Sequence, residues 1–161
     1  MYKENYNTVV LTDKKIGVIT AISISRKKGI PKSNIESANL IEDFGIEGDA
    51  HATFGWHRQI SLLAMESIEK MLEKLPKLTP GIFAENITTT GLDLTAIKIG
   101  TKIKIGKSAL LEITQIGKEC HSKCAIYRIA GDCVMPTEGI FAKVIAGGYI
   151  SVNDEIEILE L

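Results

Sequence analysis

The sequence contains only three cysteines, and all of them fall within residues 120–133. An odd number of cysteines in a chain without a secretion signal argues against a disulfide framework. Long apolar runs are also lacking, because none reaches the roughly 18 residues that a membrane-spanning helix needs. Residues 1–15 do not show the charged-then-apolar pattern of a signal peptide. We therefore expect a cytoplasmic protein.

An excess of charge of one sign is lacking as well, since 19 Lys and Arg residues face 20 Asp and Glu residues and the formal net charge is -1. Such a balance does not favour bulk attraction to nucleic acid or to an acidic membrane surface. The 161 residues, 45% of them hydrophobic, suit one domain with one substantial core. We expect an N-terminal arm over residues 1–15 and a single domain over residues 16–161, with neither nucleic acid nor membrane as a partner.

Short apolar stretches and period-two alternation predict β-strands over much of the chain. The expected extended segments are residues 16–25, 35–40, 58–63 and 109–115. Two further segments, residues 97–105 and 150–158, alternate on both sides of a turn former, Gly100 or Asn153. These two segments could be matched pieces of one barrel.

Clear helical periodicity is confined to residues 64–75, where apolar residues recur at helical spacing between charges. Pro76 and Pro80 are expected to end this helix. Many short strands with Gly and Asn turns, and few helices, predict a mainly β fold. The expected architecture is an antiparallel β-barrel with a few short helices.

The densest cluster of functional residue types is Gly45 to His51, with the sequence G-I-E-G-D-A-H, followed by Trp56, His57 and Arg58. Glycine permits backbone angles that are closed to other residues and lets a ligand approach the backbone. Asp49 could orient the His51 imidazole or share a proton with it, and His57 and Arg58 could bind a phosphate. An ordinary surface loop would explain the same residues. The pattern matches neither the dinucleotide fingerprint nor the P-loop.

A second polar segment is Glu85-Asn86, which lies between apolar residues just before an expected strand. The pair either forms a turn or points into a pocket. The residue types alone do not separate these two interpretations.

Basic residues, among them Lys118 and His121, flank Cys120. Nearby positive charge favours the thiolate, which is the reactive and metal-binding form of cysteine. Cys120 could therefore carry sulfur, ligate a soft transition metal, or join Cys124, Cys133 and a histidine in a zinc site. The spacing of the three cysteines fits a structural zinc site poorly, and burial as small apolar residues would explain Cys124 and Cys133.

Taken in order, these segments resemble the MOSC domains, the module at the C-terminus of molybdenum-cofactor sulfurases. The likeness covers residues 16–160 and is strongest to short, free-standing bacterial members. It rests on four stretches of the sequence: Gly45 to His51 with the strand at Arg58 to Leu63, Pro80 to Asn86, Gly91 to Leu94, and Ala109 to Cys120. The order and spacing of these motifs are more specific than any one of them.

Two departures from the family pattern stand out. Gly117 and Glu119 occupy the places of an arginine and a proline that often precede the family's cysteine. This change puts the anion-binding role of that loop in doubt and directs attention to Lys118. Ala84 replaces the usual glycine before Glu85.

The resemblance implies a β-barrel that handles the molybdenum cofactor, or sulfur destined for metal centres. In the family the cysteine is viewed either as a persulfide-bearing sulfur carrier or as a protein ligand to molybdenum. The partners implied are a cysteine-desulfurase-type, pyridoxal-phosphate-dependent sulfur donor or molybdenum-cofactor enzymes. Sulfur transfer and the molybdenum-dependent reduction of N-hydroxylated compounds are the reactions implied.

The site expected from these arguments has Cys120 as the working thiolate and as the metal ligand, and molybdopterin as the bound cofactor. Lys118 and Arg58 are the expected cations for the pterin phosphate. The remaining cofactor contacts are expected from Gly48, Asp49, His51, Glu85 and Asn86. The alternative is a non-enzymatic, zinc-stabilised barrel that binds a partner protein.

Overall fold

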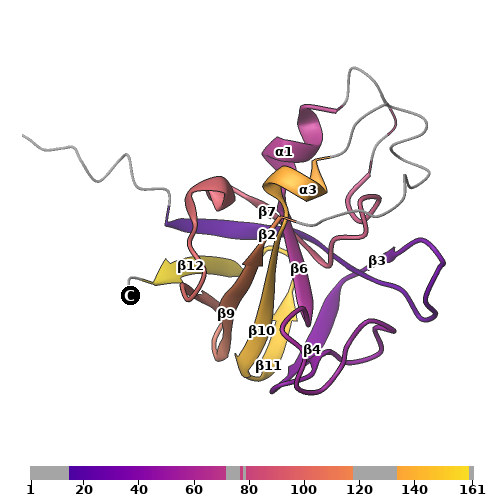
Figure 1. The fold of residues 1–161 in the computed structure, drawn as a ribbon, viewed down its shortest axis with the longest axis vertical. Coiled ribbons are helices and arrows are strands. Elements are labelled where there is room, and N and C mark those ends of the chain that lie inside the picture. Colours follow the sequence, from indigo (N-terminus) through magenta and orange to yellow (C-terminus); the bar gives the residue numbers. More distant parts are fainter. Residues whose placement is uncertain (1–14, 72–76, 78, 118–133, 160–161) are drawn as a thin grey trace, which may run out of the picture.

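The computed structural model describes residues 15–71, 77, 79–117 and 134–159. Its largest sheet contains eight strands (Figure 1). They are β2 (Ile16–Ile24), β3 (Ser33–Ile35), β6 (Ile60–Ala64), β7 (Ile87–Thr90), β8 (Lys102–Ile105), β9 (Ala109–Ile116), β10 (Ile140–Ala146) and β12 (Glu155–Leu159). A smaller sheet contains β11 (Gly148–Ser151), β4 (Ser37–Ile41) and β5 (Gly45–Ile46), in that order.

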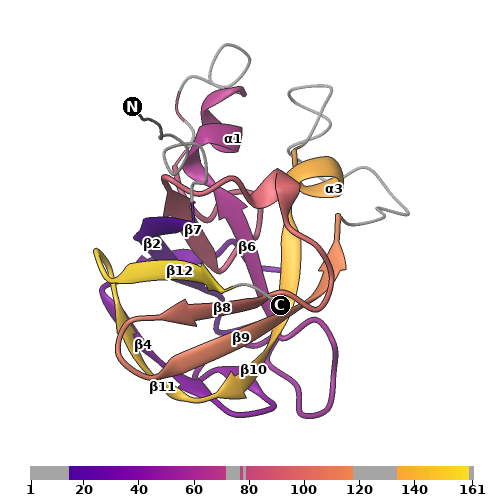
Figure 2. The ribbon, with the colours of Figure 1, turned by 90° about the vertical axis from the view of Figure 1, so that its left-hand side faces the viewer.

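The large sheet closes on itself into a barrel (Figure 2). Its strand order is β12-β8-β9-β10-β6-β7-β2-β3, and β12 also pairs with β2. In that pairing Glu155 lies opposite Val18, and Ile156 lies opposite Gly17. The pairing produces a closed seven-stranded barrel, with β3 lying outside the closed ring along the other half of β2. The predicted mainly β barrel is confirmed, although β6 and β7 pair in parallel.

The interior of the barrel is filled by β-branched and aliphatic side chains. Ile19, Leu62 and Ile103 come from three different strands, and none of them is exposed to solvent. A second cluster lies outside this core and contains Leu63, Ile68, Met71, Phe83, Val134, Met135 and Phe141. All five residues of β6 are buried because this strand contributes to both clusters.

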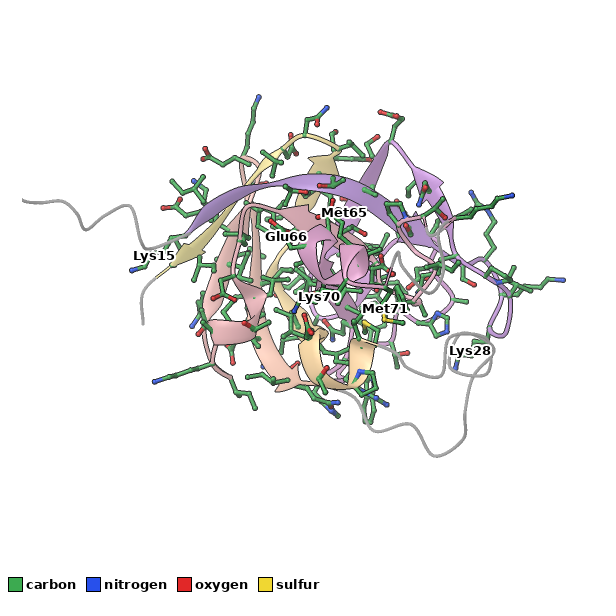
Figure 3. The ribbon with its side chains drawn as sticks, turned by 90° about the horizontal axis from the view of Figure 1, so that it is seen from above. Lys15, Lys28, Met65, Glu66, Lys70 and Met71 are labelled. Atoms are coloured by element: carbon green, nitrogen blue, oxygen red, sulfur yellow. The ribbon has the colours of Figure 1, made fainter. Side chains whose placement is uncertain are left out.

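Two short helices, α1 (Met65–Glu69) and α3 (Met135–Glu138), cover the second cluster at one end of the barrel (Figures 1 and 3). They are joined by Glu138, whose Oε1 accepts hydrogen bonds from Ser67 Oγ at 2.6 Å and from Lys70 Nζ at 2.9 Å. A single 3₁₀ turn, η2 (Leu94–Ala96), precedes β8. None of the described helices is long and apolar enough to cross a membrane.

The helix predicted over residues 64–75 is confirmed only for Met65–Glu69. Lys70 and Met71 already form a turn, closed by a hydrogen bond from Met71 N to Ile68 O at 2.9 Å. Residues 72–76, which include the expected terminator Pro76, lie outside the described residues.

The four predicted strands at residues 16–25, 35–40, 58–63 and 109–115 are confirmed, with ends shifted by at most two residues. The prediction over residues 97–105 is wrong in its first half, since β8 begins only at Lys102. Ile97 is buried and Ile99 is 62% exposed. The alternation of these two residues therefore comes from a turn that buries one side chain and leaves the other in solvent.

The proposed match between residues 97–105 and 150–158 is confirmed only after the turns, where β8 and β12 are neighbouring antiparallel strands of the barrel. The first segment contributes one strand to the barrel, whereas the second spans β11 of the small sheet and β12 of the barrel. The turn predicted at Asn153 is present, and this residue adopts the left-handed conformation with φ of 78°.

Candidate functional site

A pocket of about 290 Å³ lies where four segments distant in sequence come together. The β2–β3 loop contributes Lys28 and Lys32, and Phe141 comes from β10. The loop before β7 contributes Ala84 and Asn86. The long segment from β5 into β6 provides the remaining wall, made of His51, Thr53, Trp56, Arg58, Gln59 and Ser61. Its volume lies at the low end of the range for small-molecule sites.

The charged side chains that line the pocket from the described residues are cationic. Lys28, Lys32 and Arg58 all line it, whereas no Asp or Glu of the described residues does so. Positive side chains that converge on a concave, partly desolvated surface attract anionic ligands. The pocket is therefore suited to a ligand that carries phosphate or carboxylate groups.

Arg58 is held between two aromatic rings. Its guanidinium carbon lies 5.6 Å from the centre of the Trp56 ring and 5.5 Å from the centre of the Phe141 ring. Both distances are within the range of a cation–π interaction. These contacts fix the position of the cation and leave its N–H groups free of any ion pair with the described residues.

His57, the other half of the predicted phosphate-binding pair, does not line the pocket. Its Nε2 lies 3.0 Å from Gln115 Oε1 on β9, and its ring packs on Trp56 with the centroids 4.4 Å apart. His57 therefore ties the loop to the barrel, while Arg58 faces the pocket.

Asp49 lies directly behind the pocket wall and is 5% exposed. Its Oδ1 accepts a hydrogen bond from Ser25 N at 3.1 Å and lies 3.6 Å from Lys32 Nζ, while its Oδ2 accepts one from Asn86 Nδ2 at 3.3 Å. The side chains of Asp49 and Lys32 are 0% and 4% exposed, so they form a buried ion pair. Asp49 thus connects the loops that carry the pocket cations.

His51 lines the pocket and is partly exposed. Its Nδ1 lies 3.4 Å from Lys32 Nζ and 3.7 Å from Asp49 Oδ1. Partial burial and the charge of Lys32 lower the pKa of His51 below its ordinary value, and the nearby Asp49 opposes this shift. A lowered pKa keeps the imidazole neutral at neutral pH.

Asn86 lines the pocket, but both ends of its amide are already used. Its Oδ1 accepts hydrogen bonds from Ser61 N at 3.0 Å and Ser61 Oγ at 3.2 Å. Its Nδ2 donates to Ser23 O at 3.0 Å as well as to Asp49. The side chain therefore joins β2, β6 and the Asp49 loop at one point.

Glu85 does not line the pocket and is completely buried. Its carboxylate accepts hydrogen bonds from Gly81 N at 2.7 Å, Phe83 N at 3.1 Å and Thr88 Oγ1 at 2.9 Å. Burial raises the pKa of the Glu85 carboxyl, and these three donors oppose the increase. Glu85 shapes the loop that presents Ala84 and Asn86, and a direct contact with a cofactor would require some of these bonds to break.

Gly48 also does not line the pocket, and its φ of 89° places it in the left-handed region. Gly45 has a φ of 133°, and an added Cβ there would lie 2.9 Å from Gln59 O. The two glycines therefore give the segment a path that other residues would strain.

The predicted thiolate and its neighbouring cation lie outside the described residues, because Lys118, Cys120, His121, Cys124 and Cys133 all fall within residues 118–133. The expected meeting of the Gly45–Arg58 loop with Asn86 is observed in the pocket, and the place of Cys120 beside them stays a prediction. Among the described side chains, no three His, Cys, Asp or Glu residues come close enough to hold a metal ion.

Several pocket residues were not predicted to contact a ligand from the sequence: Lys28, Lys32, Trp56, Gln59, Ser61 and Phe141. The two lysines belong to a basic segment, R-K-K-G-I-P-K over residues 26–32, from which the sequence indicates either a solvated loop or lysines that attract an anion near a pocket. The sequence carries no comparable signal for Phe141, because only the pairing of β10 with β6 brings it to the pocket.

Comparisons with known proteins agree with this architecture. The YuaD protein from Bacillus subtilis is similar, with 21% identity, a TM-score of 0.74, and coverage of 89% of this chain and 95% of that chain. YiiM from Geobacillus stearothermophilus has 21% identity and a TM-score of 0.68, covering 89% of this chain and 75% of that one. YiiM from Escherichia coli has 20% identity and a TM-score of 0.61, covering 89% and 70%. At these identities the likeness shows a shared fold.

Among curated proteins, none matches the chain in sequence. The family profile described as MOSC domain matches residues 49–157, which include the Asp49 loop, the Glu85-Asn86 turn and the first three residues of β12. This chain therefore belongs to the MOSC domain family, which is associated with molybdenum-cofactor functions.

Proposed function

We propose that the protein binds the molybdenum cofactor in the pocket beside Arg58, and that Cys120 is its working thiolate. The observation that carries the proposal is the convergence of Lys28, Lys32 and Arg58, from two separate segments, on one pocket without a lining carboxylate among the described residues. Family membership supports the choice of this cofactor over other anions. We place the protein in the cytoplasm, where reducing conditions keep a reactive cysteine out of disulfides.

The residues present fit an anionic pterin. Its phosphate would be held by Lys28 and Arg58, with Lys32 close by and partly compensated by Asp49. Trp56 also lines the pocket and is 44% exposed, so it would offer apolar surface to the pterin beside Arg58. The molybdenum cofactor supplies a metal–sulfur centre when it is bound. Lys118 remains a predicted further cation, and Gly48, Asp49, Glu85 and Asn86 would support the site by holding its walls.

Cys120 has two proposed roles. As a sulfur carrier, its thiolate would attack the terminal sulfur of a persulfide on a cysteine-desulfurase-type, pyridoxal-phosphate-dependent donor. A Cys120 persulfide would form, and the donor's own thiolate would leave. As a ligand to molybdenum, Cys120 would serve the reduction of N-hydroxylated compounds, with two electrons drawn from a separate redox protein.

The test is elemental analysis and intact-mass spectrometry of freshly purified protein, measuring Mo, W, Zn, bound pterin and a sulfur adduct on Cys120. Lys28→Met with Arg58→Met is expected to lower the retained pterin about tenfold or more, because two phosphate contacts are lost. Lys104→Met, at an exposed position of β8 away from the pocket, is the matched control.

Four outcomes decide the question. Pterin that is retained equally by the double variant and by the control would overturn the assignment of this pocket. One Zn per chain without pterin would favour the zinc-stabilised barrel instead. A Cys120→Ser variant that loses the sulfur adduct but keeps pterin would favour the sulfur-carrier role, whereas loss of Mo with pterin retained would favour the ligand role.

A further inference from the structure

Three charged or titratable groups meet at the pocket wall, where Lys32 and His51 line the pocket and Asp49 lies behind them, and the distances between them are unequal. Lys32 Nζ lies 3.4 Å from His51 Nδ1, which is within hydrogen-bonding distance. Asp49 Oδ1 lies 3.7 Å from the same nitrogen, which is too far for a hydrogen bond. By these distances the lysine is the nearer group and lies within hydrogen-bonding distance of His51 Nδ1, while Asp49 acts on the ring from farther away.

This arrangement selects one form of the imidazole. An ammonium group has three donors and no acceptor, so a ring nitrogen that bonds to it must be unprotonated. In a neutral imidazole the proton is then on the other nitrogen, Nε2. An aspartate in the same place would select the opposite tautomer, because a carboxylate accepts the proton of Nδ1–H.

Asp49 accepts hydrogen bonds from donors other than His51. Its two oxygens already accept hydrogen bonds from Ser25 N and from Asn86 Nδ2, and the charge of Lys32 lies 3.6 Å away. Lys28 also faces this group, and its charge acts on His51 in the same direction as that of Lys32. A cation beside Nδ1 repels a protonated ring nitrogen, which again favours the proton on Nε2.

We propose that Lys32 is a positioning residue that fixes the tautomer of His51, keeping Nδ1 as an acceptor and leaving Nε2–H to donate to the ligand. His51 is then a hydrogen-bond donor in the pocket, and not a general base. The ligand presents an acceptor to it, such as a phosphate or carbonyl oxygen. The tautomer does not depend on the identity of the ligand, whereas the use of Nε2–H as a donor rests on the proposed function.

The tautomer is measured by long-range ¹H–¹⁵N NMR of the ligand-free, ¹⁵N-labelled protein at neutral pH, with His51 assigned by the signals that His51→Gln removes. The expected spectrum shows a protonated Nε2 and an unprotonated Nδ1. Lys32→Met is expected to move the population toward Nδ1–H, because Asp49 is then the nearest partner. Lys28→Met removes a weaker charge effect without removing a bond to His51, so it should shift the tautomer much less than Lys32→Met does.

A protonated Nδ1 in the unmodified protein would overturn the proposal, even if Lys32→Met failed to fold. An unchanged tautomer in folded Lys32→Met would also overturn it. The consequence for binding is tested with two amides, since a Gln side chain places its NH₂ near Nε2 of histidine and an Asn side chain places it near Nδ1.

His51→Gln should therefore retain roughly fivefold more pterin than His51→Asn, the effect of about one hydrogen bond. Equal retention would refute the donor role of Nε2–H. Absence of pterin from the unmodified protein would refute the proposed function and leave the NMR result standing.

Discussion

Asn86 Nδ2 donates a hydrogen bond to Asp49 Oδ2 over 3.3 Å, joining two residues that the chain separates by the whole of β6 and α1. Both side chains are buried, and both belong to segments expected from the sequence to bind a ligand. In the structure they bind each other and the backbone around them. Their contribution to the pocket is to fix the relative positions of its walls.

Replacing Asn86 should destabilise the fold strongly. Asn86→Ala removes the partners of Ser61 N, Ser23 O and Asp49 Oδ2 inside the protein. Because buried polar groups left without partners are costly, the free energy of unfolding should fall by roughly 2–4 kcal/mol. Urea unfolding followed by the fluorescence of Trp56, the single tryptophan, measures the change. Asn39→Ala replaces a half-buried amide that has no hydrogen bond to the described residues, so it should lower the free energy of unfolding much less. An equal decrease in the two variants would contradict the proposed role of the Asn86 hydrogen bonds.

Replacing Ala84 with glycine should stabilise the protein. Ala84 replaces the family's usual glycine, yet it adopts a φ of 67°, in the left-handed region that disfavours a Cβ. Ala84→Gly should therefore raise the free energy of unfolding by about 0.5 kcal/mol, after the extra chain entropy of glycine is subtracted. Ala96→Gly, at an exposed position without a positive φ, should lower it. The idea fails if both variants lose stability equally.

At Gly117 the backbone requires glycine, although the family often has an arginine at this position. Its φ is 74°, and a Cβ added there would lie 2.4 Å from Pro136 O. Gly117→Ala should lower the free energy of unfolding by roughly 3 kcal/mol, because it adds a collision with backbone to the left-handed strain. Gly100→Ala, with a φ of 94° and open space around the new Cβ, should cost only about 1 kcal/mol. Similar losses in the two variants would show that the backbone near Pro136 moves aside easily.

Burial of Glu85 should make the free energy of unfolding decrease as pH rises. Burial raises the pKa of its carboxyl in the folded state, so the folded protein binds this proton more tightly than the unfolded chain does. The stabilisation is complete below the unfolded-state pKa and is lost as pH rises through the folded-state pKa. The difference in unfolding free energy between the unmodified protein and Glu85→Gln should therefore shrink as pH rises from about 4 to 7. Glu69→Gln, at an exposed position of α1, is the control and should show no such pH dependence. A difference between the unmodified protein and Glu85→Gln that grows with pH would contradict a raised pKa of Glu85.

Cys120 should be the most reactive of the three thiols. Its neighbours Lys118 and His121 favour a thiolate, whereas Asp132 beside Cys133 disfavours one. Iodoacetamide labelling of the native protein across pH, with peptide-level mass spectrometry, should modify Cys120 first and more slowly as pH falls. Faster labelling of Cys124 or Cys133 would identify a different working thiol. Collective protection of all three that a chelator releases would indicate the zinc site.

Local patterns were sufficient to predict the barrel class, because most of its strands show an alternation or a short apolar stretch that indicates a buried face, although β10 was not among the predicted strands. The same patterns failed at Ile97 and Ile99, where burial of one residue and exposure of the other arise from a turn. Over so short a stretch, a turn and a strand produce the same alternation of apolar and polar residues in the sequence.

The site was predictable only in part. The motif resemblance pointed to loops from which His51, Arg58 and Asn86 line one pocket, and their contact with a ligand stays a prediction. The sequence could not show that the hydrogen-bonding groups of Glu85 and Asn86 are already used, since their partners lie on other strands or on the loop backbone. Equally, it could not separate Lys32, which is buried beside Asp49, from an ordinary solvated lysine.

The pairing of β12 with β2 has a consequence for synthesis of the chain. Residues 16–18 of β2 leave the ribosome early, but their partners on this edge, residues 155–157, are translated last among the described strands. Until then the nascent protein carries an open strand edge bearing Ile16 and Val18, which are solvent-exposed even in the finished barrel. Open apolar edges recruit other chains. Folding intermediates that lack β12 should therefore be prone to association through this edge, and the pairing of β12 with β2 should remove that tendency.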